Sequence, residues 1–357
     1  RFRAAARARN IPAMRHADRL ALAPLDLSYS SPKRFDGEGF AITENRFVQA
    51  DIDLIQRVYR MLRRAHGLWL HLRDAATIAE TRHADLYRKH ILRDLRDRRF
   101  LLTLRDLGAA TYALGTPPHD VRSALHDIRG GALLALIGFA TAEARGEPIS
   151  DSEIRHAALR ARDHARIMRH AVSDLDPQLR EIDSVITTHS MLDFVDKWND
   201  AVYRAGERQV TINIDVAFDG FIAEHDLETA ALDRVVYNHI NNAAHYCADN
   251  KVSVAAFAIN DKLVRWVVSN AILPEHNLQL REATNGNLGR LFEGGATRGG
   301  HSIGLAMCAE IVAAACGLPS ADEAVARGYI GATVRDHRYC AWFHWPIHQP
   351  SAPLTYA

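Results

Sequence analysis

The chain has 357 residues, of which 48% are apolar and 24% charged, with a formal net charge of +1. A chain of this length buries a sizeable core and has room for two or three domains. A net charge this close to zero gives no electrostatic reason to expect nucleic acid as a partner.

The sequence contains no run of about 18 apolar residues, so neither a membrane span nor a signal peptide is predicted, and a cytoplasmic location is expected. The chain begins at Arg1, which leaves room for an upstream sensing or membrane segment. None of the four cysteines forms a CxxC pair, which favours small core residues in a reducing compartment over a metal site or a disulfide framework. They are Cys247, Cys308, Cys316 and Cys340.

The first hundred residues divide into two parts. Residues 1–50 mix prolines, glycines and short apolar patches, which predicts an irregular segment. In residues 51–100 apolar side chains recur at helical spacing, which predicts one or two long helices in an input or linker region. Pro117 and Pro118 then interrupt the pattern, and a new helix is expected after them because proline is tolerated only in a helix's first turn.

A helical hairpin is predicted within residues 101–200. Its first helix carries an apolar stripe from Val121 to Ala140, a turn is expected over residues 145–152, and its second helix should run from Ile154 to about Asn199. Two such helices alone would leave wide apolar faces exposed. We therefore expect a homodimer in which two hairpins form a four-helix bundle.

Residues 205–350 are predicted to form an α/β sandwich. Strands are expected at 210–216, 252–259, 263–269, 330–334 and 340–347, helices at 226–247 and 303–315, and a long polar stretch at 274–301. This order predicts a mixed sheet that is covered on one face by helices. The expected fold class is therefore α plus α/β.

Three short strings carry the chemistry, and the first is HDIRGG at 126–131. The neutral imidazole of His126 can attack a phosphoryl group, and the adjacent carboxylate of Asp127 can accept the other ring proton or orient the ring. A rival acceptor, His119, begins the similar string HDVRSAL seven residues earlier, directly after the two prolines.

The second string, NHINNAAHY at 238–246, places Asn238 and Asn242 four residues apart, so both amides share one helix face. Amide carbonyl oxygens suit Mg²⁺, which also bridges to nucleotide phosphates. In the third string, GGHSIGL at 299–305, a glycine turn opens a helix. Backbone amides at such a helix start bind phosphate, and Gly300, Gly304 and Leu305 fit this role.

In this order and at these separations the three strings resemble those of bacterial sensor histidine kinases, whose ATP-binding fold is shared with gyrase, heat-shock chaperones and mismatch-repair ATPases. The resemblance implies ATP and Mg²⁺ as cofactors, His126 as the phosphoacceptor, and a response-regulator receiver domain as the partner. It also assigns roles in the nucleotide site. It places Asn242 on the magnesium, Asn238 and His245 beside the phosphates, Tyr246 in the same string, Thr297 and Phe292 in the lid, and Arg298 or Arg290 near the γ-phosphate.

The sequence also departs from the family. Gly131 stands where proline is usual, so the bend of the acceptor helix is expected to come from glycine flexibility. Asn270 replaces the aspartate that binds the adenine amino group, and the glycines that normally follow are absent. Asparagine can still accept that hydrogen bond through its carbonyl oxygen.

These features favour a homodimeric histidine kinase that phosphorylates His126 and then a response-regulator aspartate. The alternative is a non-catalytic phosphotransfer relay or scaffold with a degenerate ATP-binding domain; a third reading is an ATPase without histidine chemistry. Asn238 stands where hydrolytic relatives carry a glutamate that activates water, which favours transfer over hydrolysis.

Overall fold

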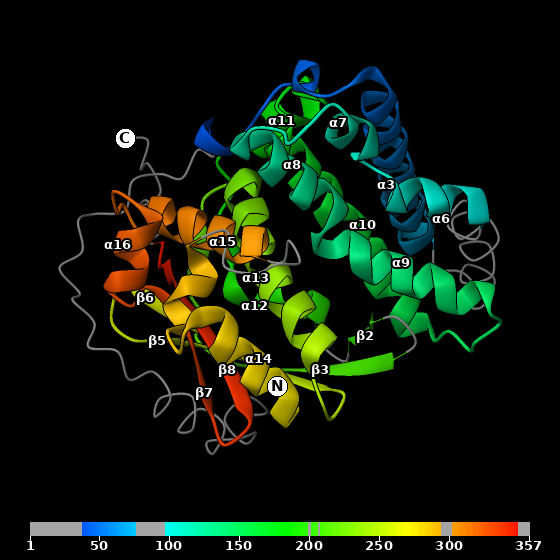
Figure 1. Ribbon diagram of the computed structural model, residues 1–357. Helices are drawn as coiled ribbons and strands as arrows, with labels where there is room; N and C mark the ends of the chain where they lie inside the picture. Colours follow the sequence, from blue (N-terminus) through cyan, green and yellow to red (C-terminus); the bar gives the residue numbers. More distant parts are fainter. Residues whose placement is uncertain (1–37, 76–96, 199–200, 206–207, 294–301, 349–357) are drawn as a thin grey trace, which may run out of the picture.

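The computed structural model describes residues 38–75, 97–198, 201–205, 208–293 and 302–348. Helices from the first half of the chain pack against a mixed sheet and its helices from the second half (Figure 1). The predicted class, a helical region followed by an α/β sandwich, is confirmed. Among the described residues, no helix has the length and apolar character needed to cross a membrane.

The described residues of the helical half form short turns and longer helices. In chain order these elements are η1 (Glu38–Phe40), η2 (Glu44–Arg46), α3 (Gln49–Ala75), α6 (Arg98–Arg105), α7 (Ala109–Ala113), α8 (His119–Arg129), α9 (Gly131–Ala144) and α10 (Asp151–Ala171). The helix predicted within residues 51–100 is thus present up to Ala75, and residues 76–96 lie outside the described part of the chain.

The first helix of the predicted hairpin is bent by glycine. α8 begins directly after Pro118, as expected from the two prolines. It ends at Arg129, and Gly131, the first residue of α9, adopts φ +51°, a left-handed conformation that favours glycine. The sequence prediction of a glycine bend is therefore confirmed. α10 returns antiparallel to α9 after a capping box made by Ser150 and Glu153.

The second hairpin helix is shorter than predicted. α10 ends at Ala171 rather than near Asn199, because Val172 turns extended and pairs with Ile42. Pro177 then opens a new helix capped by Asp176, since the residue before a proline disfavours helical geometry. The rest of the predicted helix consists of α11 (Pro177–Asp183), β1 (His189–Ser190), α12 (Met191–Val195) and η3 (Asp196–Trp198).

The apolar face of the hairpin is covered within the same chain. Helix α3 lies along α10, and Ile55, Val58 and Leu62 of α3 are completely buried. They belong to one core with side chains of the hairpin that are at most 1% exposed, namely Leu125, Ile128, Leu133, Leu136 and Met168. These side chains are thus covered within one chain, and the homodimer stays a prediction.

The sheet has six strands in the order β2-β3-β5-β6-β8-β7, with β3 and β5 parallel and all other neighbours antiparallel. Their bounds are β2 (Val202–Ala205), β3 (Arg208–Ala217), β5 (Lys251–Ala258), β6 (Leu263–Ala271), β7 (Ile330–Arg335) and β8 (Arg338–Pro346). The five strands predicted from alternation are confirmed. The short strand β2 was missed, as was β4 (Phe221–Ala223), which pairs with β1 outside this sheet.

Helices α13 (Asp226–Tyr246) and α15 (Ser302–Ala315) cover one face of the sheet, as predicted (Figure 1). The stretch predicted to be long and polar contains α14 (Pro274–Thr284) and η4 (Leu288–Phe292), and α16 (Ala321–Ala326) follows α15. Because α13 packs against α9 and α10 as well as the sheet, it is the central helix of the molecule. This position lets one helix touch both the hairpin and the candidate site.

Candidate functional site

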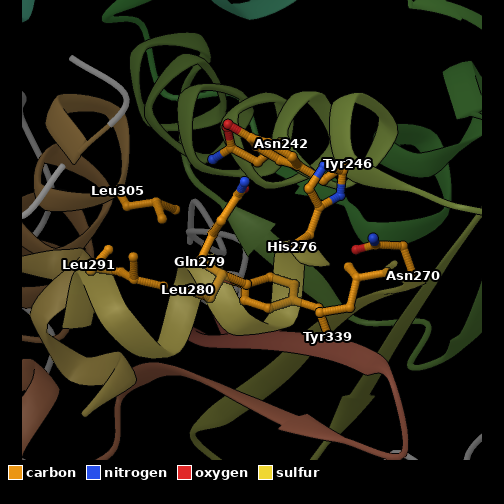
Figure 2. Close-up of a pocket in the computed structure, with 11 residues that line it drawn as sticks. Asn242, Tyr246, Asn270, His276, Gln279, Leu280, Leu291, Leu305 and Tyr339 are labelled. Atoms are coloured by element: carbon orange, nitrogen blue, oxygen red, sulfur yellow. The ribbon is translucent and has the colours of Figure 1, made fainter. Parts of the chain in front are cut away.

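An apolar pocket opens between α13, the end of β6, α14 and α15 (Figure 2). Its walls combine aliphatic side chains with a few polar ones. The lining residues are Asn242, Tyr246, Asn270, Ile272, His276, Gln279, Leu280, Ala283, Leu291, Leu305 and Tyr339. An apolar cleft with a small number of convergent polar groups is typical of a site for a flat organic ligand.

Asn270 supplies an unsatisfied acceptor in this pocket. The residue is 1% exposed, and its Nδ2 donates to the carbonyl of Ala271 at 3.1 Å, while its Oδ1 is buried without a hydrogen-bond partner. A buried carbonyl left unpaired costs roughly 1–3 kcal/mol, which a ligand amino group would recover. The pocket therefore fits the adenine amino group that the sequence assigned to Asn270.

The asparagine string forms one face of α13. Asn242 and Tyr246 line the pocket, and Asn238, 6% exposed, lies one turn earlier on the same face. Burial raises the pKa of the Tyr246 phenol, so this group remains a hydrogen-bond donor at neutral pH. His245 is exposed on another face of α13 and does not line the pocket.

The first turn of α15 touches the predicted phosphoacceptor. A methyl group at Gly304 would lie 2.7 Å from Cε1 and 2.8 Å from Nε2 of His126, and 3.3 Å from Oδ1 of Asn238. Only a residue without a side chain allows this approach. The structure thus brings together Gly304, Asn238 and His126 from α15, α13 and α8, three segments that are distant in the sequence.

The imidazole of His126 is partly buried. Its side chain is 26% exposed, and its Nδ1 is buried without a hydrogen-bond partner. The nearest carboxylate oxygen, Oδ1 of Asp127, lies 3.9 Å from that nitrogen, beyond hydrogen-bond reach. The Asp127 carboxylate forms a buried ion pair with Arg234 of α13 instead.

The side chains near His126 include a buried thiol, that of Cys308, and the second histidine, His119. Cys308 of α15 shares a side-chain hydrogen bond with Asn238, and burial, followed by the charge of Asp127, raises the pKa of its thiol. All four cysteines are buried and free, as the sequence predicts. The rival acceptor His119 is more exposed and points to Glu310 of α15, with 3.5 Å between its Nε2 and the Oε1 of that residue.

Part of the predicted site lies outside the described residues. Thr297, Arg298 and Gly300 fall in residues 294–301. Phe292 is described and buried, and Arg290 is paired over 3.9 Å with Glu293. Among the described residues no cluster of three or more histidine, cysteine or acidic side chains could hold a metal.

Sequence reasoning missed several residues of the site. His276 and Gln279 come from α14, whose polar sequence lacks an apolar stripe. His276 stacks edge-on to Tyr246 with 5.6 Å between ring centroids. Arg234 and Asn241 contact the acceptor hairpin from α13. Asn241 belongs to the asparagine string, but helical spacing indicates only neighbours on the same helix. It could not indicate that Asn241 contacts Gly131 on α9.

No family model and no curated protein matches the chain. Solved structures similar to it include the histidine kinase domain of the blue-light activated histidine kinase EL346 from Erythrobacter litoralis, with 11% identity, 83% of this chain and 94% of that chain covered, and a TM-score of 0.27. Full-length ShkA in complex with AMPPNP is 15% identical over 66% of this chain and 46% of its own, with a TM-score of 0.32. The histidine kinase ThkA, in complex with the response regulator protein TrrA, is 15% identical, with 72% of this chain and 66% of that chain covered and a TM-score of 0.28.

Proposed function

We propose that the protein is an ATP-dependent protein-histidine kinase of a two-component system. It transfers the γ-phosphoryl group of ATP to His126, and the phosphoryl group then passes to an aspartate of a response-regulator receiver domain. The observation that carries this proposal is the packing of the His126 imidazole against Gly304 and Asn238, next to the apolar pocket.

The residues of the pocket fit the parts of the nucleotide. Asn270 offers its unpaired carbonyl to the adenine amino group, and Ile272, Leu280 and Leu305 supply apolar surface for the base. The first turn of α15 offers backbone amides at the positive end of a helix dipole to the phosphates. Asn238 and Asn242 would hold Mg²⁺ through their amide oxygens, and the bound ion would neutralise phosphate charge.

The transfer balances in atoms and charge. The bond between the γ-phosphorus and the bridging oxygen breaks, ADP leaves with that oxygen, and a phosphorus–nitrogen bond forms at Nε2, the ring nitrogen next to Gly304. The proton of the other ring nitrogen is finally lost to solvent. In the second step the phosphorus–nitrogen bond breaks, a receiver carboxylate takes the phosphoryl group, and the imidazole takes one proton from solvent to return to its neutral form.

The contact between His126 and Gly304 is made within one chain, so the proposed route is intramolecular. α8 packs against α15 of its own ATP-binding half and contacts α13 through the ion pair of Asp127 and Arg234. A mixture of two inactive variants, one lacking the acceptor and the other lacking nucleotide binding, should therefore stay unphosphorylated.

Incubation with γ-labelled ATP and Mg²⁺ tests the proposal. Acid-labile label should appear on the wild type and on His119→Ala, and should be absent from His126→Ala, from Asn242→Ala, and from a mixture of these last two. Label on the mixture would exclude the intramolecular route. Nucleotide binding without label would favour an ATPase or a relay, and absence of nucleotide binding would favour the relay alone.

A further inference from the structure

Arg234 occupies the centre of the contact between α8 and the ATP-binding half. It is 2% exposed, and its guanidinium pairs with Asp127, which is also almost completely buried. The same group contacts Nδ1 of His170 on α10 at 2.6 Å and Sδ of Met307 on α15 at 3.1 Å. One side chain of α13 thus joins α8, α10 and α15.

Asn241 forms a second contact two turns further along α13. Its Nδ2 donates to the carbonyl oxygen of Gly131 at 3.0 Å, and its Oδ1 accepts a hydrogen bond from the hydroxyl of Tyr203 on β2. Gly131 is the residue at which the acceptor helix bends. Arg234 and Asn241 are seven residues apart, so they lie on nearly the same face of α13.

The two contacts bracket the segment that follows the acceptor. Asp127 is adjacent to His126, and Gly131 starts α9. The contacts of Arg234 and Asn241 together hold the C-terminal end of α8 on α13, and the His126 ring lies against Gly304. A shift of about 1 Å in a reacting group can cost about 100-fold in rate. Fixing this end of α8 therefore matters for the transfer itself.

We propose that Arg234 and Asn241 form a clamp that seats His126 against Gly304, and that Asp127 is a positioning residue acting through Arg234 rather than the acceptor of the His126 proton. This proposal rests on the proposed kinase function for its catalytic consequence. The clamp itself is a structural feature that is measurable without ATP.

The geometry separates the two roles of Asp127. Its carboxylate is paired with Arg234, and its nearest oxygen lies 3.9 Å from Nδ1 of His126, beyond hydrogen-bond distance. If Asp127 acts through Arg234, removing either partner should have the same effect, and removing both should add nothing. If Asp127 were the proton acceptor, Arg234→Met would spare the transfer and Asp127→Asn would abolish it.

The test measures the labelling rate of His126 at saturating Mg·ATP and the affinity for a fluorescent ATP analogue. Arg234→Met, Asp127→Asn and the double variant should each lose about 10- to 100-fold in rate, equally, with the affinity for the analogue within about twofold of wild type. Arg234→Lys should recover part of the rate, and Asn241→Ala should lose about tenfold. A rate for Arg234→Met within twofold of wild type would overturn the clamp.

Arg169→Met is the matched control. Arg169 forms another buried ion pair, with Asp183 at 2.6 Å, near the C-terminal end of α10, and it also donates to the hydroxyl of Tyr59 on α3. The control should lower stability without changing the maximal labelling rate.

Hydrogen exchange of the α8 amides without nucleotide gives an independent measurement. Arg234→Met should increase exchange over residues 119–129, and Arg169→Met should not. Unchanged exchange in Arg234→Met would overturn the clamp, whereas increased exchange in a protein that is never labelled would leave the clamp standing and refute the kinase function.

Discussion

At the scale of single residues, the contact between Gly304 and His126 is the most restrictive feature of the site. Added as a methyl group, a Cβ at Gly304 would approach the imidazole to 2.7 Å. Gly304→Ala should therefore displace His126 and lower the labelling rate about 100-fold. Gly67→Ala is the control, because Gly67 lies within α3 with nothing inside 4 Å of its would-be Cβ. Equal labelling rates for the two variants would contradict the seat described for His126.

His239 gives a prediction about pH. It is 3% exposed and stacked on Phe343, and burial lowers its pKa from 6.5 to about 4. In the unfolded chain His239 binds a proton below about pH 6.5, whereas in the folded chain it does so only below about pH 4. The free energy of unfolding therefore decreases as the pH falls through this window. A shift of this size corresponds to about 3 kcal/mol.

His239→Phe removes that titration. The free energy of unfolding, measured in urea from pH 7 to pH 4.5, should fall less steeply for the variant than for wild type, and the gap between the two curves should widen as the pH falls. Parallel curves would show that His239 keeps an ordinary pKa in the folded state.

Individual site residues differed in how far the sequence revealed them. Asn242, Tyr246 and Asn270 line one pocket. Asn242 was found from its helical spacing with Asn238, whereas Tyr246 and Asn270 were found from the resemblance to the histidine kinases. The partner of Asp127 was not found, because an ion pair between α8 and α13 leaves no local pattern. In the sequence, nothing distinguishes Arg234 from the other polar residues of its helix.

At the scale of elements, α9 packs against β2 through Gly138. A Cβ there would lie 2.3 Å from the carbonyl oxygen of Arg204, a backbone atom that cannot rotate away. Gly138→Ala should therefore destabilise the fold by about 1–3 kcal/mol. Gly67→Ala should stabilise it by about 0.5–1 kcal/mol, since alanine is the better helix former. Chemical denaturation of both variants provides the measurement, and a stabilised Gly138→Ala would contradict this packing.

The elements that the sequence predicted are those with a strong periodic signal. β3, β5, β6 and α13 follow clear alternation or a helical pattern and are confirmed. α14 carries no apolar stripe and was taken for a polar stretch, although Pro274 at its first turn was an available start signal. The end of α10 was missed because the extended pairing of Val172 depends on Ile42, far along the chain.

At the scale of the whole molecule, α3 takes the place on the hairpin that we had expected a second copy to fill. Among the described residues, Ile128, Leu136 and Met168 of the hairpin are at most 1% exposed in a single chain, so these side chains need no second copy to cover them. We expect light scattering of the purified chain to give a mass near 39.8 kDa. Twice that mass, together with protection of α3 on association, would contradict this arrangement.

The docking of the hairpin onto the α/β half could not be predicted from the sequence. Its contacts join residues such as Asn241 and Gly131, which are 110 positions apart. Local patterns predict the hairpin and the sandwich separately, but the order of the three strings does not say that His126 meets Gly304 of the same chain. That juxtaposition came from the structure alone.

The central claim is that ATP, bound in the pocket beside Gly304, donates its γ-phosphoryl group to His126. Locating the phosphoryl group by tandem mass spectrometry, after incubation with Mg·ATP and an alkaline quench, tests it most directly. We predict modification of His126, its absence in Asn242→Ala, and none at His119. Modification at His119 instead, or a protein that binds ATP and carries no phosphohistidine, would contradict the claim.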